Sequence, residues 1–286
     1  MPSPLNYGVL GMPPAMNNES DPIHLLSARY TPPAHAFSGR VIAVTGAGSG
    51  IGRAVSRSLA AHGATLVLLG PEIATLTSLH DEIISAQGAT PILQAMDFRG
   101  ATVSDYDAIG AALHAQFGRL DGLLHNAGIL GYHGPILNYP PEAWHEVMQV
   151  NLHAAFALTR ACLPLLETAS DASVLFTTCE WARTPRAFSA AYGVAYAAIE
   201  MFMRILADEM EFRPNLRFNA FNPGWVATPI TESLFPGLPA SHWPRPEEIV
   251  GAYLYLLGPE SHRLSGKIFG LEPPSMRTSD QAPLTA

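Results

Sequence analysis

The chain has 286 residues, of which 48 % are hydrophobic and 14 % charged, a composition typical of a folded protein with a large core. The formal net charge is -8, the pI is about 5.7 and no basic run occurs, so nucleic acid and anionic membranes are not expected partners. No apolar run approaches ~20 residues and no secretory pattern opens the chain, so we expect a cytoplasmic protein. The cysteines Cys162 and Cys179 and the scattered histidines show no metal-binding spacing, so no metal is expected.

The chain divides into three parts by composition. Residues 1–37 are rich in Pro, Asn and Ser and show no helical or strand period, which predicts an irregular N-terminal arm. An arm that wraps a neighbouring subunit is a second interpretation. Residues 38–272 form one predicted domain, and residues 273–286 a C-terminal tail.

From residue 40 onward, apolar runs alternate with helical patterns. The apolar runs predict strands within residues 41–47, 65–70, 90–97, 120–128, 172–179, 216–224 and 266–272. The segments between them predict helices within residues 50–64, 72–88, 105–118, 141–169, 190–212 and 246–258. This alternation predicts an α/β fold: a single Rossmann-type, doubly wound parallel sheet of about seven strands with helices on both faces.

A glycine-rich loop, "TGAGSGIG" at residues 45–52, joins the first of these strands to the first helix. Gly46 permits a tight turn, Gly50 lets the backbone approach a pyrophosphate, and Gly52 permits close packing of helix and strand. The helix then presents free N–H groups and the positive end of its dipole to the phosphates. The loop therefore predicts a dinucleotide site.

Three further motifs follow in order: "HNAG" at 125–128, "VN" at 150–151 and "NPGWVATP" at 222–229. With the Thr-Gly-x-x-x-Gly-x-Gly spacing of the loop, residues 38–272 resemble the short-chain dehydrogenase/reductase family, most closely a poorly characterised bacterial branch. The resemblance implies dinucleotide contacts from Thr45, Gly46, Ser49, Gly50, Ile51, Gly52, Asn126, Ala127, Gly128, Pro223, Gly224, Val226 and Thr228. It also places Asp97, at the end of the third strand, beside the adenine.

The end of the second strand usually decides between the two nicotinamide cofactors. Gly70 and Pro71 stand there, which are neither acidic nor basic, and Glu72 comes too late in the chain. Arg53, just after the glycine loop, is a candidate for a 2′-phosphate, although a surface position on the helix is the simpler interpretation. The residues lean towards NADP(H) over NAD(H).

The resemblance implies a catalytic tyrosine with a lysine four residues later, a serine thirteen residues earlier and an asparagine relay. Tyr192 and Asn151 match the tyrosine and the asparagine. Cys179 stands in the serine position and Tyr196 in the lysine position. A thiol is a weaker donor than a hydroxyl, and Tyr196 carries no charge near neutral pH. Thr178 cannot substitute for the serine, because neighbouring residues of a strand point to opposite faces.

Other residues are considered as replacements for the missing charge. Lys267 is the only lysine of the chain and lies in the last predicted strand. Arg183 and Arg186 lie between Cys179 and Tyr192 but are expected to face solvent. His125 and His133 are alternative proton donors, for which packing and a loop position are the simpler interpretations.

The segment 230–244 is apolar, aromatic and proline-rich, which predicts a covering loop over a hydrophobic small-molecule substrate. In look-alike proteins the long helices 142–169 and 190–212 form a subunit interface, which implies a homodimer or homotetramer. The expected function is a divergent NAD(P)(H)-dependent oxidoreductase that interconverts a carbonyl and an alcohol on a small apolar substrate. The alternative is a catalytically impaired dinucleotide-binding protein with a structural, regulatory or sensing role. Non-redox chemistry, as in dehalogenases of similar fold, is disfavoured because those proteins lose the glycine loop.

Overall fold

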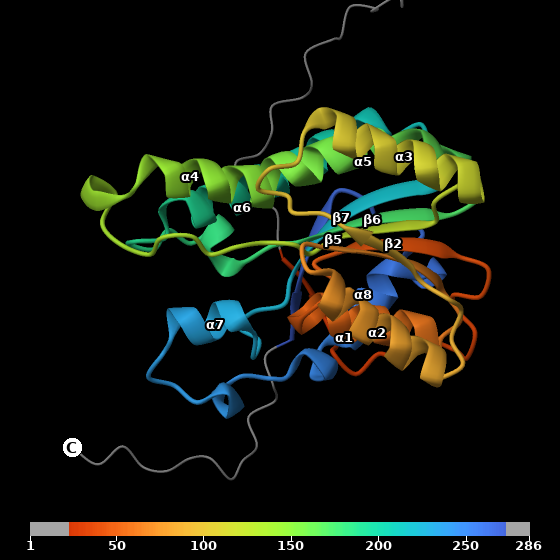
Figure 1. The fold of residues 1–286 in the computed structure, drawn as a ribbon, viewed down its shortest axis with the longest axis horizontal. Coiled ribbons are helices and arrows are strands. Elements are labelled where there is room, and N and C mark those ends of the chain that lie inside the picture. Colours follow the sequence, from red (N-terminus) through yellow and green to blue (C-terminus); the bar gives the residue numbers. More distant parts are fainter. Residues whose placement is uncertain (1–22, 273–286) are drawn as a thin grey trace, which may run out of the picture.

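Eight parallel strands form one sheet in the computed structural model, which describes residues 23–272 (Figure 1). The sheet order is β1-β8-β7-β6-β5-β2-β3-β4. The strands are β1 (His24–Leu26), β2 (Val41–Thr45), β3 (Thr65–Gly70), β4 (Ile92–Ala95), β5 (Gly122–His125), β6 (Ala172–Thr177), β7 (Leu216–Asn222) and β8 (Lys267–Leu271). The predicted doubly wound parallel sheet is confirmed, with one strand more than the seven expected.

Helices cover both faces of the sheet (Figure 1). One face carries α1 (Gly50–Ala61), α2 (Ile73–Ser85) and α8 (Val250–Leu257). The other carries α3 (Val103–Phe117), α4 (Pro141–Met148), α5 (Ala154–Thr168) and α6 (Ala190–Glu209). Because both faces are buried, the central strands read as continuous apolar runs rather than as alternating ones. The short α7 (Pro229–Leu234) stands apart from these layers.

The strand order reverses at β2, which pairs with β3 on one side and with β5 on the other. Such a switch point opens a crevice at the carboxyl ends of the strands, where ligands bind in open α/β sheets. The glycine loop follows β2 and the segment 126–128 follows β5, so both border this crevice. The sheet topology therefore positions the candidate site.

The N-terminal arm contributes a strand that the sequence analysis did not predict. β1 pairs with β8, with Leu26 opposite Leu271. Beyond it the Tyr30 ring lies 5.3 Å from the Tyr255 ring, and Phe37 is fully buried. A three-residue edge strand is too short to show a period of two, so the expectation of a wholly irregular arm was wrong for this part. Residues 1–22 and the predicted tail at 273–286 lie outside the described residues.

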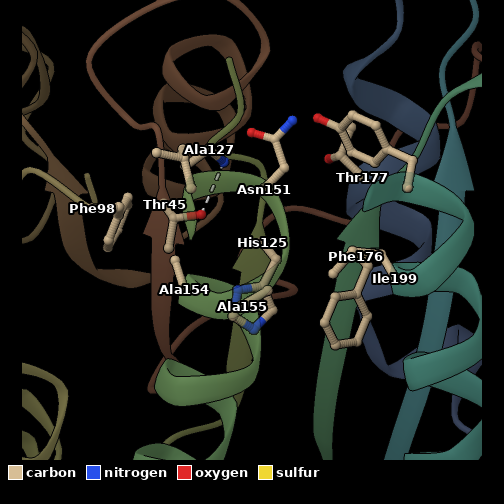
Figure 2. Close-up of a pocket in the computed structure, with 12 residues that line it drawn as sticks. Thr45, Phe98, His125, Ala127, Asn151, Ala154, Ala155, Phe176, Thr177 and Ile199 are labelled. Atoms are coloured by element: carbon tan, nitrogen blue, oxygen red, sulfur yellow. Dashed lines mark hydrogen bonds between the residues drawn. The ribbon is translucent and has the colours of Figure 1, made fainter. Parts of the chain in front are cut away.

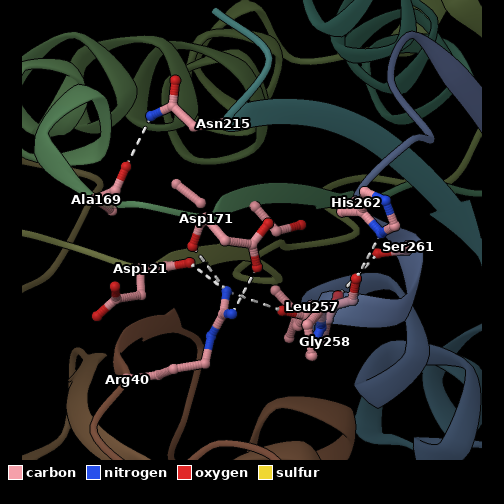
Figure 3. Close-up of polar contacts among 12 residues, drawn as sticks. Arg40, Asp121, Ala169, Asp171, Asn215, Leu257, Gly258, Ser261 and His262 are labelled. Atoms are coloured by element: carbon pink, nitrogen blue, oxygen red, sulfur yellow. Dashed lines mark hydrogen bonds and ion pairs between the residues drawn. The ribbon is translucent and has the colours of Figure 1, made fainter.

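An ion-pair network joins the amino ends of the central strands (Figure 3). Asp171, just before β6, pairs with Arg40 at 2.6 Å and with the buried Arg217 of β7. Arg40 also donates to the backbone carbonyl of Asp121, and the Asp121 carboxylate accepts from the backbone N–H of Val41 at 2.8 Å. The network lies at the edge opposite the crevice, so we assign it to stability rather than to the site.

The long helix predicted at 142–169 is interrupted by one π-helical turn, Gln149–His153, between α4 and α5. Such turns are frequent at functional sites. α6 is the one described helix long and apolar enough to cross a membrane by length and composition. Half of it is buried inside the fold, and core helices of globular proteins pass the same test.

Candidate active site

The glycine loop has the conformation that its sequence predicts. Gly46 and Gly50 have φ values of +66° and +49°, a region that favours glycine. A Cβ on Gly52 would lie 2.8 Å from the carbonyl carbon of Gly46 and 2.7 Å from the side chain of Asn126. The N-cap residue of α1, Ser49, makes no side-chain capping bond, so the first-turn N–H groups can bind an anion. The loop fits a dinucleotide pyrophosphate.

Thr45 ties this loop to the segment after β5. Its hydroxyl accepts hydrogen bonds from the backbone N–H groups of Asn126, at 2.9 Å, and Ala127, at 3.0 Å. Its own proton goes to the carbonyl of Leu124. One buried side chain thus sets the distance between the two walls of the crevice.

A cleft of about 900 Å³ opens between these walls. It is lined by Gly46, Ser49, Gly50, Ile51, Asn126, Ala127, Gly128, Thr177, Thr178, Cys179, Tyr192, Tyr196, Pro223, Gly224, Trp225, Val226, Thr228, Pro229, Ile230 and Thr231. The structure therefore brings together most of the residues predicted for the cofactor and the reaction. Of the remaining predicted residues, Gly52 packs behind the loop, and Thr45 and Asn151 line a smaller cavity beneath the cleft.

Two tyrosines of α6 stand in the wall of the cleft beside Cys179. The rings of Tyr192 and Tyr196 are 4.8 Å apart, and the residues are only 6 % and 7 % exposed. Burial raises the pKa of both phenols, and for Tyr192 the neighbouring Tyr196 and Cys179 raise the pKa further. Burial also raises the pKa of the Cys179 thiol, to about 12. All three groups are therefore neutral at physiological pH.

Tyr196 occupies the position predicted for it, deep in the cleft. A Cβ on Gly128 would collide with its hydroxyl group and would lie 3.7 Å from the Asn151 carbonyl oxygen. The Asn151 amide accepts from the backbone N–H of Ile129 and donates to its carbonyl, both at 2.9 Å. Asn151, from the π-helical turn, thus holds the loop after β5 against the tyrosines.

A buried ion pair lies behind the reacting side of the cleft. Glu200, two turns beyond Tyr192 on α6, accepts from the Thr178 hydroxyl at 2.8 Å and lies 3.7 Å from Arg183. Thr178 and Cys179 both follow the end of β6 and both line the cleft, so the strand alternation expected for them does not apply, and the Thr178 hydroxyl is bound to Glu200. The expectation that Arg183 faces solvent was wrong, because Glu200 draws it inward; Arg186 is exposed.

The smaller cavity contains His125 (Figure 2). Its ring stacks on Phe176 at 4.8 Å, and its Nε2 lies 2.8 Å from the Thr159 hydroxyl. Burial lowers the pKa of His125 to about 3, so the ring is neutral and acts as a packed core residue. His133 is exposed and stacks on Trp181 at the mouth of the cleft, 5.8 Å between ring centres.

The residues considered for cofactor choice lie outside the cleft. Asp97 does not line the cleft; it is exposed and lies 3.6 Å from Arg99. Arg53 donates to the Ser78 hydroxyl at 3.0 Å and to Glu82 at 2.7 Å, so its guanidinium ties α1 to α2. Lys267 is exposed at the start of β8 and does not line the cleft.

Sequence reasoning did not single out Trp181 and Trp225, which border the reacting side of the cleft. The Trp181 ring lies 5.9 Å from the Tyr192 ring and 5.3 Å from the Trp225 ring. Their positions in the sequence could have identified them, because Trp181 comes two residues after Cys179 and Trp225 directly follows Gly224, both predicted site residues. Large rings next to such motifs are brought to the same edge of a parallel sheet.

Comparison with known proteins places this site in a family. The short chain dehydrogenase family matches residues 40–238. The uncharacterized oxidoreductase YciK of Escherichia coli K12 is 37 % identical over 85 % of this chain and 96 % of its own length. A solved short chain dehydrogenase from Pseudomonas syringae is 43 % identical, with a TM-score of 0.83 over 85 % of this chain and 98 % of its own. One from E. coli CFT073, solved with NADPH, is 37 % identical, with a TM-score of 0.82 over 85 % of this chain and 100 % of its own. The chain therefore belongs to the short-chain dehydrogenase/reductase family of oxidoreductases.

Proposed function

We propose that the protein is an NADP(H)-dependent oxidoreductase that converts a carbonyl of a small apolar substrate into an alcohol. The observation that carries this proposal is the placement of the Tyr192 phenol in the wall of the cleft that begins at the glycine loop. A bound dinucleotide and a donor of a proton therefore share one crevice.

The residues present fit the dinucleotide. The positive φ values of Gly46 and Gly50 and the space kept free at Gly52 suit a pyrophosphate, as do the N–H groups at the start of α1. The NADPH complex of the E. coli CFT073 relative supports NADP(H) as the cofactor. The neutral Gly70 and Pro71 place no carboxylate against a 2′-phosphate.

The dinucleotide, when bound, supplies the hydride. Tyr192 donates the proton to the substrate oxygen, and Cys179 lies against the same position as a weaker donor. Tyr196 offers a neutral hydroxyl where the resemblance implies a cation. Because burial raises the Tyr192 pKa, its protonated form prevails, and this form is the one that carbonyl reduction requires.

The test is NADPH oxidation against a panel of neutral aldehydes and ketones. We expect a measurable rate that falls about 100-fold or more in Tyr192→Phe, which keeps the ring and removes only the hydroxyl. NADPH affinity, measured by calorimetry, should stay unchanged in that variant. An equal rate in Tyr192→Phe would refute the assignment.

A second function, dinucleotide binding without turnover, is favoured by one observation: neither Cys179 nor Tyr196 carries the charge or strong donor that the family resemblance implies. The pair Tyr196→Lys and Cys179→Ser separates the two functions. A silent parent that binds NADPH, together with an active double variant, would establish the binding role. A parent rate that the double variant merely increases would support the reductase.

We also propose self-association through α5 and α6. Phe156, Val194, Met201 and Ile205 are exposed on these helices at 52 %, 47 %, 54 % and 47 %. Apolar side chains this exposed on neighbouring helices are typical of a subunit interface. A homodimer or homotetramer is the expected state, to be measured by sedimentation.

A further inference from the structure

A group of aromatic side chains, here called the aromatic cluster, borders the cleft at Tyr192. It consists of Trp181, Trp225, Phe235 and Trp243, which come from three separate segments of the chain. Trp225 is central: its ring lies 5.3 Å from Trp181, 5.2 Å from Phe235 and 6.2 Å from Trp243. Trp181 in turn contacts Tyr192 edge-on at 5.9 Å. The cluster thus leads from the protein surface to the phenol that donates the proton.

The rings of the aromatic cluster do not bury one another completely, as the side chains of a hydrophobic core do. All four of its members are only half-buried, and Phe188, which lies edge-on to His133 beside Trp181, is 49 % exposed. Trp225 lines the cleft directly, together with Val226 and Ile230. Ring surface that remains uncovered beside a reacting group is available to a ligand, since burying it removes apolar area from water.

The cleft is also without charge. Among the described residues that line it there is no Asp, Glu, Lys, Arg or His. The nearby Glu200 lies 3.7 Å from Arg183 and also faces the charge of Arg204. On the side of the cleft beside Cys179 and Tyr192, away from the start of α1, a carboxylate on the substrate would lose water and find no countercharge among the lining residues, which is costly. An anionic substrate therefore fits this side of the cleft poorly.

We propose that the substrate is an uncharged aromatic ketone or aldehyde whose ring packs against Trp225 and Trp181 while its carbonyl faces Tyr192. The inference rests on the proposed reductase function and adds the substrate class. Ring–ring contacts gain about 3- to 10-fold in affinity per pair beyond the area that they bury. An aromatic ring should therefore be preferred to a saturated ring of the same skeleton.

The experiment compares three ketones by calorimetry: acetophenone, cyclohexyl methyl ketone and phenylglyoxylate. The first two differ only in saturation of the ring, and the third adds a carboxylate. Titration in the presence of NADP⁺, which has no hydride to give, keeps each ketone intact. We expect acetophenone to bind about 3- to 10-fold more tightly than the saturated ketone. Phenylglyoxylate should bind most weakly.

Two variants locate the effect. Trp225→Leu removes the central ring but keeps an apolar side chain, so it should weaken binding of acetophenone more than binding of the saturated ketone and thereby reduce the preference. Trp144→Leu is the matched control, because Trp144 packs against Tyr139 outside the aromatic cluster and should keep the preference. If Trp225→Leu fails to fold, Trp243→Leu replaces it, with a smaller expected loss.

Equal affinity for acetophenone and cyclohexyl methyl ketone would overturn the proposal, as would tightest binding of phenylglyoxylate or a preference that is undiminished in Trp225→Leu. The binding measurement needs no turnover. A ring preference without NADPH oxidation would therefore sink the reductase function and leave the aromatic site standing. Turnover of saturated ketones without a ring preference would do the reverse.

Discussion

Replacing Asp171 by asparagine tests whether the network at the amino ends of the strands stabilises the fold. The side chain of Arg217 is only 2 % exposed, and that of Asp171 is 25 % exposed. The amide in Asp171→Asn would keep an acceptor oxygen, and the carbonyl of Gly258 would still accept from Arg217 at 2.7 Å. The guanidinium would nevertheless lose its countercharge. We therefore expect a loss of about 2–3 kcal/mol in the free energy of unfolding at pH 7, below the full effect of breaking a buried pair.

The matched control is Asp107→Asn. Asp107 also pairs with an arginine, Arg160, but the two side chains are 52 % and 47 % exposed. Its loss should be about 0–1 kcal/mol. Urea denaturation followed by circular dichroism measures both variants against the parent.

The pH dependence gives a second, independent readout. Burial alone would raise the pKa of Asp171, but the charges of Arg217 and Arg40 outweigh burial and hold that pKa below its usual value. A carboxyl with a lowered pKa in the fold stabilises it above the unfolded pKa of about 3.9, and the gain is lost as pH falls through the folded pKa. The difference between parent and Asp171→Asn should therefore shrink below about pH 4. Equal losses in the two variants at pH 7, or a difference that does not shrink as the pH falls below about 4, would refute the reasoning.

Two glycines give further predictions. Gly52→Ala should weaken NADPH binding by about 10-fold or more, because its Cβ would press on the Gly46 backbone. Calorimetry measures the NADPH affinity. The control Gly100→Ala, which has open space around its Cβ, should bind NADPH as the parent does. Gly251→Ala should lower the free energy of unfolding by about 1–3 kcal/mol, despite the better helix propensity of alanine, because its Cβ would meet the backbone of Tyr30. If denaturation shows Gly251→Ala to be as stable as the parent, the backbone at Tyr30 can move away from the added Cβ at no cost and the prediction is wrong.

The sequence was sufficient for the sheet, because most of its seven main strands are apolar runs that alternate with helical patterns. It was also sufficient for the glycine loop, whose function depends on backbone freedom that glycine itself signals. The sequence did not predict β1, because three residues carry no period and their pairing with β8 joins segments more than 240 residues apart. Contacts of that kind depend on the tertiary fold and leave no local pattern.

The sequence did not predict the inward position of Arg183, for a related reason. Arginine in a polar loop ordinarily faces water, and only the buried Glu200, brought close by the packing of α6 on the strand end, reverses that preference. The aromatic cluster likewise forms only when the segments after β6, β7 and α7 meet at one edge of the sheet. Residue type predicted what each side chain could do, and the topology decided which neighbours it met.

Tyr196, at the position where the family resemblance implies a cation, is a buried neutral phenol. In the described part of the chain, the cleft from Gly46 to Trp225 is lined by neutral groups, and Glu200 behind it faces the charges of Arg183 and Arg204. Burial and the neighbouring Tyr196 and Cys179 raise the Tyr192 pKa, so this phenol is protonated at physiological pH and can serve as a proton donor, while the raised pKa also makes it a weaker acid. The neutral cleft supports two parts of the proposed function, an uncharged substrate and Tyr192 as the proton donor. Under that proposal a carbonyl needs from the protein only the proton that Tyr192 holds, whereas an alcohol would need the phenolate that this environment disfavours.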